Sequence, residues 1–253
     1  GQAVEREAPP GASARELQAL MLSTVHQLLS TMHASMRLDD VDGLLNCIHS
    51  LYLKAYRSVN DALRSQAAEA ADARVPEAEL RHALTLKGES TGYYLQVLLA
   101  MYSKLEPGAT PPAKGAPPPP LGSDAHVLAI AAAAEYPLVS FCLHVLRDYL
   151  KLHEAALGGA QRAASPPPGG AGNASAHAAL RALEPHVVSL LDGLLALHEA
   201  QFVRHLPGFY PLFVDLMHCE SKEIRHVLRD IFSKRVGTVL QQGQGQPAPH
   251  TPQ

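Results

Sequence analysis

Apolar side chains recur at spacings of three and four residues along most of this chain, and no other feature constrains its fold more. In an α-helix, residues three and four apart lie on one face, so each such stripe predicts a helix with one buried side. The clearest stripe follows Ser221, a residue suited to cap a helix. It contains Ile224, Val227, Leu228, Ile231, Phe232, Val236 and Val239.

The same spacing predicts helices in the rest of the chain. The first covers residues 14–36, and a second follows the potential N-caps Asp39 and Asp40. Prolines are expected to start or kink several of the others. These further helices follow Pro76, cover 90–105, cover 124–157 with a kink at Pro137, cover 176–200 with a break or kink near Pro185, and begin at Pro207. We expect the helix after Pro207 to pair antiparallel with the final helix and Phe232 to be a core residue of that pair.

The composition agrees with a helical fold. Hydrophobic residues make up 47% of the 253 residues, tryptophan is absent and aromatic residues reach only 5%. Alanine and leucine are plentiful and cost little to place in a helix, whereas runs of β-branched and aromatic residues are missing. The predicted fold class is all-α, either an α-solenoid of the HEAT or armadillo kind or an irregular antiparallel helical array. No internal period decides between the two.

Two segments rich in proline and glycine divide the chain, because such segments lack the apolar side chains of a packed core. The expected organisation has seven parts. They are a disordered N-terminus (1–13), a helical block (14–106), a Pro-rich linker (107–123), a helical block (124–157), a Pro/Gly-rich linker (158–175), a C-terminal helical block (176–240) and a disordered tail (241–253).

The charge and the cysteines exclude several classes of protein. A formal net charge of −3 gives no general attraction to nucleic acid or to an anionic membrane. Three widely spaced cysteines (Cys47, Cys142 and Cys219) fit a reduced, cytosolic protein better than a disulfide framework. No apolar run reaches the roughly 18 residues of a membrane span, and no signal peptide precedes the first helix. Because the chain begins with Gly1, we expect it to be a fragment of a longer protein.

No motif for catalysis or for a cofactor stands out. His153-Glu154 and His198-Glu199 begin like a zinc-protease helix, but the second histidine is replaced by Leu157 and Phe202. His218, Cys219 and His226 lack a fourth ligand at zinc-site spacing. Phosphate-binding loops and serine-nucleophile elbows are absent. Carboxylates such as Asp148 are expected to be solvated or salt-bridged. We therefore predict no catalytic, cofactor or metal site and a binding or structural role.

A small basic strip near the C-terminus provides the candidate partner contacts. It is made of Arg225, Arg229, Lys234 and Arg235, and Arg225, Arg229 and Lys234 lie off the apolar stripe of the last helix. A solvated helix face explains such a strip more simply than a phosphate or lipid contact does. If these side chains matter for function, we expect them to bind a protein partner.

Four sequence blocks resemble a known family in the order in which they occur there. The last runs from Val187 to Leu240 and includes QFVRHLPGFYPL at 201–212. The earlier blocks are KAYRSVNDALR at 54–64, LKGEST at 86–91 with the helix after it, and VLRDY at 145–149. Together they resemble the C-terminal region of the brefeldin A-inhibited guanine nucleotide exchange factors, the large trans-Golgi activators of Arf GTPases. Gly88 and the long proline-rich segments depart from that pattern.

The resemblance implies a non-catalytic scaffold or regulatory region of an Arf GTPase exchange factor in Golgi vesicle trafficking. Leu206-Pro207-Gly208 is followed by Phe209, so the glutamate finger of the family's exchange domain is not found here. The implied roles are dimerisation, membrane recruitment or autoregulation. The implied partners are Arf-type or other small GTPases, a second copy of the chain and, through the parent protein, the Golgi membrane from the cytoplasmic side. The alternative is a free-standing helical-repeat adaptor without an exchange domain.

Overall fold

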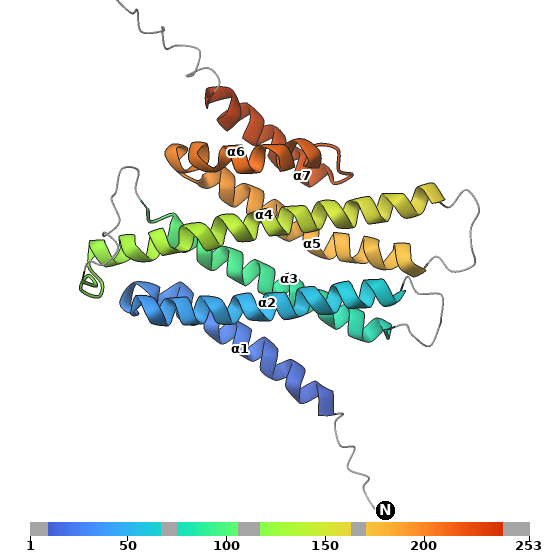
Figure 1. Cartoon of the computed structure of the whole chain (residues 1–253), viewed down its shortest axis with the longest axis horizontal. Coiled ribbons are helices and arrows are strands. Elements are labelled where there is room, and N and C mark those ends of the chain that lie inside the picture. The colour runs from blue at the N-terminus through green and yellow to red at the C-terminus, as the bar shows by residue number, and fades with distance from the viewer. Residues whose placement is uncertain (1–9, 67–74, 106–116, 163–170, 240–253) are drawn as a thin grey trace, which may run out of the picture.

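A computed structural model describes residues 10–66, 75–105, 117–162 and 171–239 of the chain. Helices account for nearly all of these residues, and no strand occurs among them (Figure 1). A 3-10 turn, His33–Ser35, follows the first helix, and a π-helical turn, Phe232–Val236, follows the last. The α-helices are α1 Pro10–Met32, α2 Leu38–Gln66, α3 Glu77–Tyr102, α4 Asp124–Arg162, α5 Ala171–Ala196, α6 Glu199–Leu216 and α7 Lys222–Ile231.

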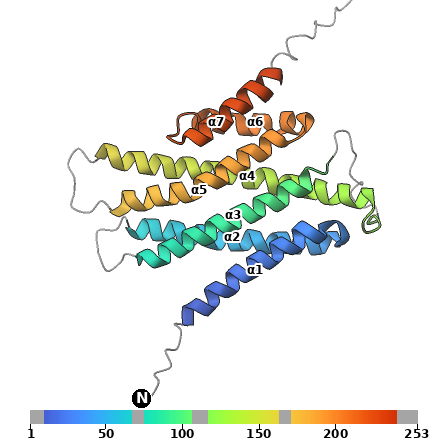
Figure 2. The same ribbon diagram turned by 180° about the vertical axis from the view of Figure 1, so that it is seen from behind.

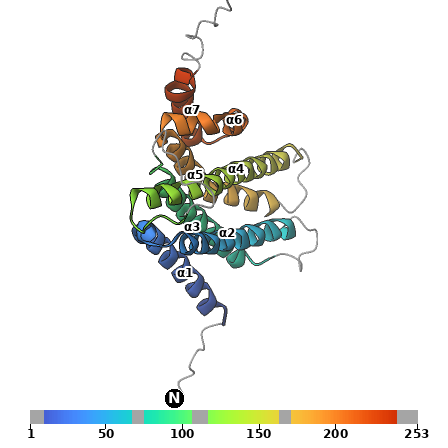
Figure 3. The same cartoon turned by 60° about the vertical axis from the view of Figure 1, so that its left-hand side comes forward.

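The helices stack in two layers. The odd-numbered helices α1, α3, α5 and α7 contact one another in sequence and form one layer, which faces the viewer in Figure 2. The even-numbered helices α2, α4 and α6 form the other layer, and Figure 3 shows the array from the side. Apart from the pair α5 and α6, each helix thus packs on its neighbour in sequence and on the next helix but one, which is the arrangement of an α-solenoid. The predicted all-α class is confirmed, and between the two alternatives the structure favours the solenoid.

The core runs along the middle of the array, where α3, α4 and α5 are covered on both sides. Phe141, Val145 and Tyr149 of α4 lie at the centre and are almost fully buried. Length and composition alone would also allow α4 to cross a membrane. That is weak evidence, because a core helix of a packed protein passes the same test and these side chains already face protein.

The two helices predicted before and after Ser90 are one continuous helix, α3. Gly88 and Gly92 lie inside this helix and allow α5 to approach closely. A Cβ atom at Gly88 or at Gly92 would lie 3.1 Å from the ring of His186 on α5. Packing against α5 therefore outweighs the low helix propensity of the two glycines.

Helix α3 begins directly after Pro76, as predicted. Pro185 and Pro207, by contrast, neither interrupt nor start a helix. Helix α4 continues through Pro137, α5 continues through Pro185, and α6 begins at Glu199 rather than at Pro207. Gln201 fixes the start of α6. Its Oε1 accepts a hydrogen bond from the backbone N–H of His198 (3.2 Å), and its Nε2 donates to the carbonyls of Tyr102 and Leu105 (3.2 and 3.0 Å). The hydrogen bonds of Gln201 to the end of α3 thus determine where α6 begins.

The predicted pairing of α6 with the last helix is wrong, because α7 packs mainly against α5. The stripe itself is confirmed on Ile224, Leu228 and Ile231, which are fully buried. Phe232 is only half-buried and meets Tyr210 edge-on, with ring centroids 6.1 Å apart. The predicted core position of Phe232 is corrected accordingly: the helix passes into its π-helical turn at this residue, beside the exposed Tyr210.

Some helix ends fall inside segments that were predicted to lack structure. Helix α1 begins at Pro10, before the expected start at residue 14. Helix α4 extends to Arg162 and α5 begins at Ala171, so helix occupies both ends of the predicted linker 158–175. Residues 117–123 precede α4 without helix. The remaining predicted linker and terminal residues, 1–9, 107–116, 163–170 and 241–253, lie outside the described residues, as do 67–74, 106 and 240 of the predicted helical blocks.

Candidate functional site

Two residues of the predicted basic strip, Arg225 and Arg235, make hydrogen bonds to backbone carbonyls within the fold. The guanidinium group of Arg235 donates to the carbonyl of Leu195 (2.6 and 3.1 Å) and to that of Leu197. It therefore caps the C-terminal end of α5, where backbone carbonyls lack helical partners. Arg225 donates to the carbonyl of Cys219 (2.5 Å) and holds the turn between α6 and α7. Sequence reasoning missed these roles, because all three acceptor carbonyls lie outside the helical segment of the donor.

The other two residues of the strip lie on the surface. Lys234 pairs with Asp230 one helical turn earlier (2.5 Å). Arg229 is exposed, and within the described part of the chain it makes no hydrogen bond or ion pair. The four residues consequently do not form one exposed strip, and Arg229 is the member whose charge is most available to a partner. Their role in partner binding stays a prediction.

An apolar stripe remains exposed on α1, at the end of the array. Leu22, Val25 and Leu29 of this helix are buried, whereas five large apolar side chains on its other faces are 38–64% exposed. The stretch 17–36 contains no Asp, Glu, Lys or Arg. We define the exposed apolar face of α1 as Leu17, Leu20, Met21, Leu28 and Met32. Contiguous exposed apolar surface of this kind marks interaction sites on soluble domains.

The histidines are distributed over the array. No three His, Cys, Asp or Glu side chains of the described residues are placed to hold a metal ion. Several histidines instead join helices. His126 donates from Nε2 to the carbonyl of Met36 (2.8 Å), and His205 lies 2.9 Å from the hydroxyl of Tyr102. His218 and His226 are both exposed, and Cys219 between them is buried.

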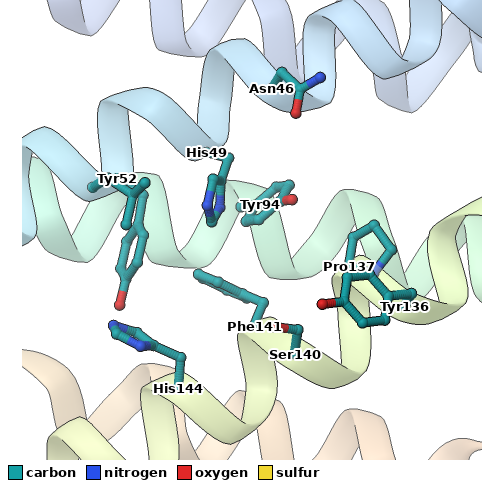
Figure 4. A pocket seen from close by; sticks show the side chains of 10 residues that line it. Asn46, His49, Tyr52, Tyr94, Tyr136, Pro137, Ser140, Phe141 and His144 are labelled. Carbon is teal, nitrogen blue, oxygen red and sulfur yellow. The ribbon is translucent and has the colours of Figure 1, made fainter.

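A cavity of about 430 Å³ lies between α2, α3 and α4 (Figure 4). Aromatic rings form much of its wall: Phe141 meets Tyr94 and Tyr52 edge-on, at centroid distances of 4.7 and 4.9 Å. Exposed residues, among them Tyr136 and Ser140, line it from the solvent side. The lining residues are Asn46, His49, Tyr52, Leu53, Tyr94, Tyr136, Pro137, Ser140, Phe141 and His144.

Three buried polar atoms of the cavity wall have no hydrogen-bond partner among the described residues. They are Nδ1 of His49, the hydroxyl of Tyr52 and Nε2 of His144. Tyr52 is 1% exposed, and Figure 4 shows its hydroxyl pointing toward the ring of His144, whose centroid lies 5.8 Å from that of Tyr52. Since buried polar groups are normally paired, three such atoms at one cavity need an explanation.

Burial keeps the polar groups of this cavity uncharged. It lowers the pKa of His49 and of His144, so both imidazoles are neutral at pH 7. Burial likewise raises the pKa of the Tyr52 hydroxyl, with smaller contributions from Asp148 and Tyr56. A neutral imidazole has one donor and one acceptor nitrogen, and a phenol can do both. The cavity therefore offers donors and acceptors without a net charge.

A buried ion pair lies beside the cavity. Nζ of Lys87 on α3 donates to Oδ2 of Asp148 on α4 (2.5 Å), and both side chains are about 95% buried. The ammonium also lies 5.0 Å from the ring centroid of Tyr56, and that ring lies 4.9 Å from the ring of His144. The expectation of a salt-bridged Asp148 is confirmed, although its partner was not predicted.

Comparison with known protein families gave a match over most of the chain. The family described as the BIG2 C-terminal domain matches residues 16–233. The chain belongs to the BIG2 C-terminal domain family. Searches of curated proteins and of solved structures each returned no match. The matched range begins in α1 and ends in the π-helical turn, so the family includes all seven α-helices except the first residues of α1.

This membership corrects the family identified from the sequence. From four short blocks the sequence analysis identified the brefeldin A-inhibited exchange factors. The family that matches is described only as the BIG2 C-terminal domain, and this description replaces that identification. The abbreviation is also used for bacterial immunoglobulin-like domains, which are β-sandwiches. The described residues of this member are helical and form no strand, so the family name cannot denote an immunoglobulin-like fold here.

Proposed function

We propose that this chain is a non-catalytic helical scaffold that acts as the C-terminal regulatory region of a guanine nucleotide exchange factor for Arf-type GTPases in Golgi vesicle trafficking. The exposed apolar face of α1 carries the scaffold part of this proposal. Five large apolar side chains on a terminal helix of a solenoid provide a surface for a partner helix, and solenoids commonly bind partners along extended surfaces.

The chemistry of this face supports a protein partner. Thr24 and Thr31 lie among its apolar residues, and their hydroxyls donate to the carbonyls of Leu20 and Gln27 (2.8 and 2.7 Å). These hydroxyls are thus already paired within α1. The face also lacks the cationic side chains with which a helix binds an anionic lipid surface. A membrane role would therefore pass through a bound GTPase or through the rest of the parent protein.

The blocks at 54–64, 86–91 and 145–149 support the scaffold part of the proposal as well. Each block supplies one member of the buried group Tyr56, Lys87 and Asp148. In this fold the three residues hold α2, α3 and α4 together, as is suitable for a scaffold. Function follows from sites rather than from folds, so the regulatory role needs a direct test.

The test uses the chain with an Arf-type GTPase loaded with fluorescent GDP. Alone, the chain should leave the rate of GDP release unchanged, and marked acceleration would contradict a non-catalytic role. Added to an Arf exchange domain, it should bind that domain or the GTPase and change the release rate. Leu17→Ser combined with Leu20→Ser should remove this effect, whereas the control Ser23→Ala with Gln27→Ala, at exposed polar positions of the same helix, should keep it. No binding and no effect of the unchanged chain would contradict the regulatory role.

A further inference from the structure

We propose that the cavity between α2, α3 and α4 binds an uncharged ring compound that carries a carboxamide or hydroxyl group. The inference is independent of the proposed function, because it rests on a different face of the array. It starts from the size of the cavity, about 430 Å³, which lies in the range of small-molecule sites.

The aromatic walls of the cavity favour a ligand that contains a ring. Tyr52 and Tyr94 each meet Phe141 edge-on beside the cavity, at centroid distances of 4.9 and 4.7 Å. Pro137 adds a further apolar surface from α4 (Figure 4). Aromatic faces and edges pack well against another ring, in offset or edge-to-face contact. An aliphatic ligand would gain only the burial of its area.

The three unpaired polar atoms of the lining favour a ligand with a polar substituent. Nδ1 of His49, the hydroxyl of Tyr52 and Nε2 of His144 together offer at least one donor and one acceptor. A carboxamide both donates and accepts, as does a hydroxyl, so either can pair with two of the three groups. A purely apolar ring would leave all three unpaired, which is costly in a buried site.

The absence of charge in the lining selects a neutral ligand. None of the ten lining residues is Asp, Glu, Lys or Arg. The charged residues that act on His144 from outside the lining are Asp148, Lys87 and Lys151, and the first two pair with each other. A buried carboxylate or ammonium group without a partner is strongly unfavourable. Phosphates, carboxylates and metal cations are therefore poor ligands for this site.

The experiment compares three probes of nearly the same shape: benzamide, benzoate and toluene. Each is titrated into the protein at pH 7.5 while the imidazole signals of His49 and His144 are followed by NMR. Benzamide should shift both signals with a dissociation constant of about 1 mM, as expected of a small ligand. Benzoate and toluene should bind at least about ten-fold more weakly, because the first is charged and the second leaves the polar atoms unpaired.

Two pairs of variants test whether benzamide binds in the cavity. Tyr52→Phe keeps the ring and removes the hydroxyl, so it should weaken benzamide binding about ten-fold. Tyr102→Phe removes a buried hydroxyl outside the cavity and should leave binding unchanged. Ser140→Trp should block the cavity from its exposed side, whereas Ser189→Trp, at an exposed position on α5, should not.

Each unfavourable outcome has a clear meaning. Equal binding of benzamide and benzoate would show that the site does not select against charge and would overturn the proposal. Benzamide binding by Tyr52→Phe as tight as by the unchanged chain would also overturn it, because the Tyr52 hydroxyl would then not pair with the ligand. If none of the probes shifts the imidazole signals at 10-fold excess over the expected constant, the polar atoms are satisfied by water alone and the proposal is wrong.

Discussion

Lys87 and Asp148 form an ion pair of 2.5 Å in the interior of the array, between α3 and α4. Both side chains are about 95% buried, and the ammonium also lies over the ring of Tyr56 on α2. Three helices from three different parts of the sequence thus meet at one charged group. Because a buried charge needs its partner, the pair fixes how these helices are positioned relative to one another.

Removal of one member of this pair should strongly destabilise the fold. Lys87→Met leaves the Asp148 carboxylate buried without a partner, and we expect a loss of about 3–5 kcal/mol in the free energy of unfolding. The double variant Lys87→Met with Asp148→Leu should recover most of that loss, since an apolar pair of similar volume needs no charge compensation. Urea denaturation of the three proteins measures both quantities. A double variant as unstable as Lys87→Met would contradict this account.

The basic residues near the C-terminus should separate into structural and surface positions. Arg235→Ala removes the cap of α5 and should lower stability by about 1.5–3 kcal/mol, as for other hydrogen bonds of charged groups. Arg229→Ala, at an exposed position without a hydrogen bond or ion pair in the described chain, should change it by less than about 0.5 kcal/mol. Thermal denaturation of the two variants side by side checks the assignment, and equal losses would disprove it.

Two phenylalanines of the C-terminal block should differ in the same way. Phe213 on α6 is fully buried, so Phe213→Ala should cost about 3–5 kcal/mol. Phe232 is half-buried beside Tyr210. Phe232→Ala should lower the free energy of unfolding by about half as much as Phe213→Ala, because a smaller apolar area leaves water on folding. Denaturation midpoints of the two variants give the comparison. A larger loss for Phe232→Ala would mean that this residue belongs to the core after all.

Stability should fall in mildly acidic solution. Burial lowers the pKa of His49, His144, His186 and His205 in the folded protein below the ordinary value of 6.5. As pH falls below about 6.5, the unfolded chain takes up protons at these positions before the folded chain does, so the unfolded state is favoured. The free energy of unfolding should therefore be nearly constant above pH 7.5 and decline as the pH falls from about 6.5 through the folded pKa values.

The slope of this decline tests which groups cause it. Around His144, Asp148 raises the pKa, while Lys87, Lys151 and His49 lower it further. His186 faces the glycines of α3, and burial alone lowers its pKa. His186→Gln should consequently reduce the slope between pH 6.5 and 5 without removing it. A stability that rises in this window would contradict the neutral state of the buried histidines.

The sequence by itself determined that this chain folds into helices and which faces of them are buried. Ile224, Leu228 and Ile231 were assigned to the core from their spacing, and Ser221 does cap α7, accepting a hydrogen bond from the N–H of Ile224 (3.2 Å). These properties are local, because the helical period and a cap depend on residues within about one turn of each other.

Only the tertiary structure decided where helices continue, what they pack against and where the cavity lies. Helix α3 continues through Gly88 and Gly92, against which α5 packs, and Gln201 at the start of α6 donates to carbonyls at the end of α3. The cavity joins His49, Tyr94 and His144, which are far apart in sequence. Such contacts depend on how whole helices stack, and that free energy is summed over many residues rather than encoded in any short segment.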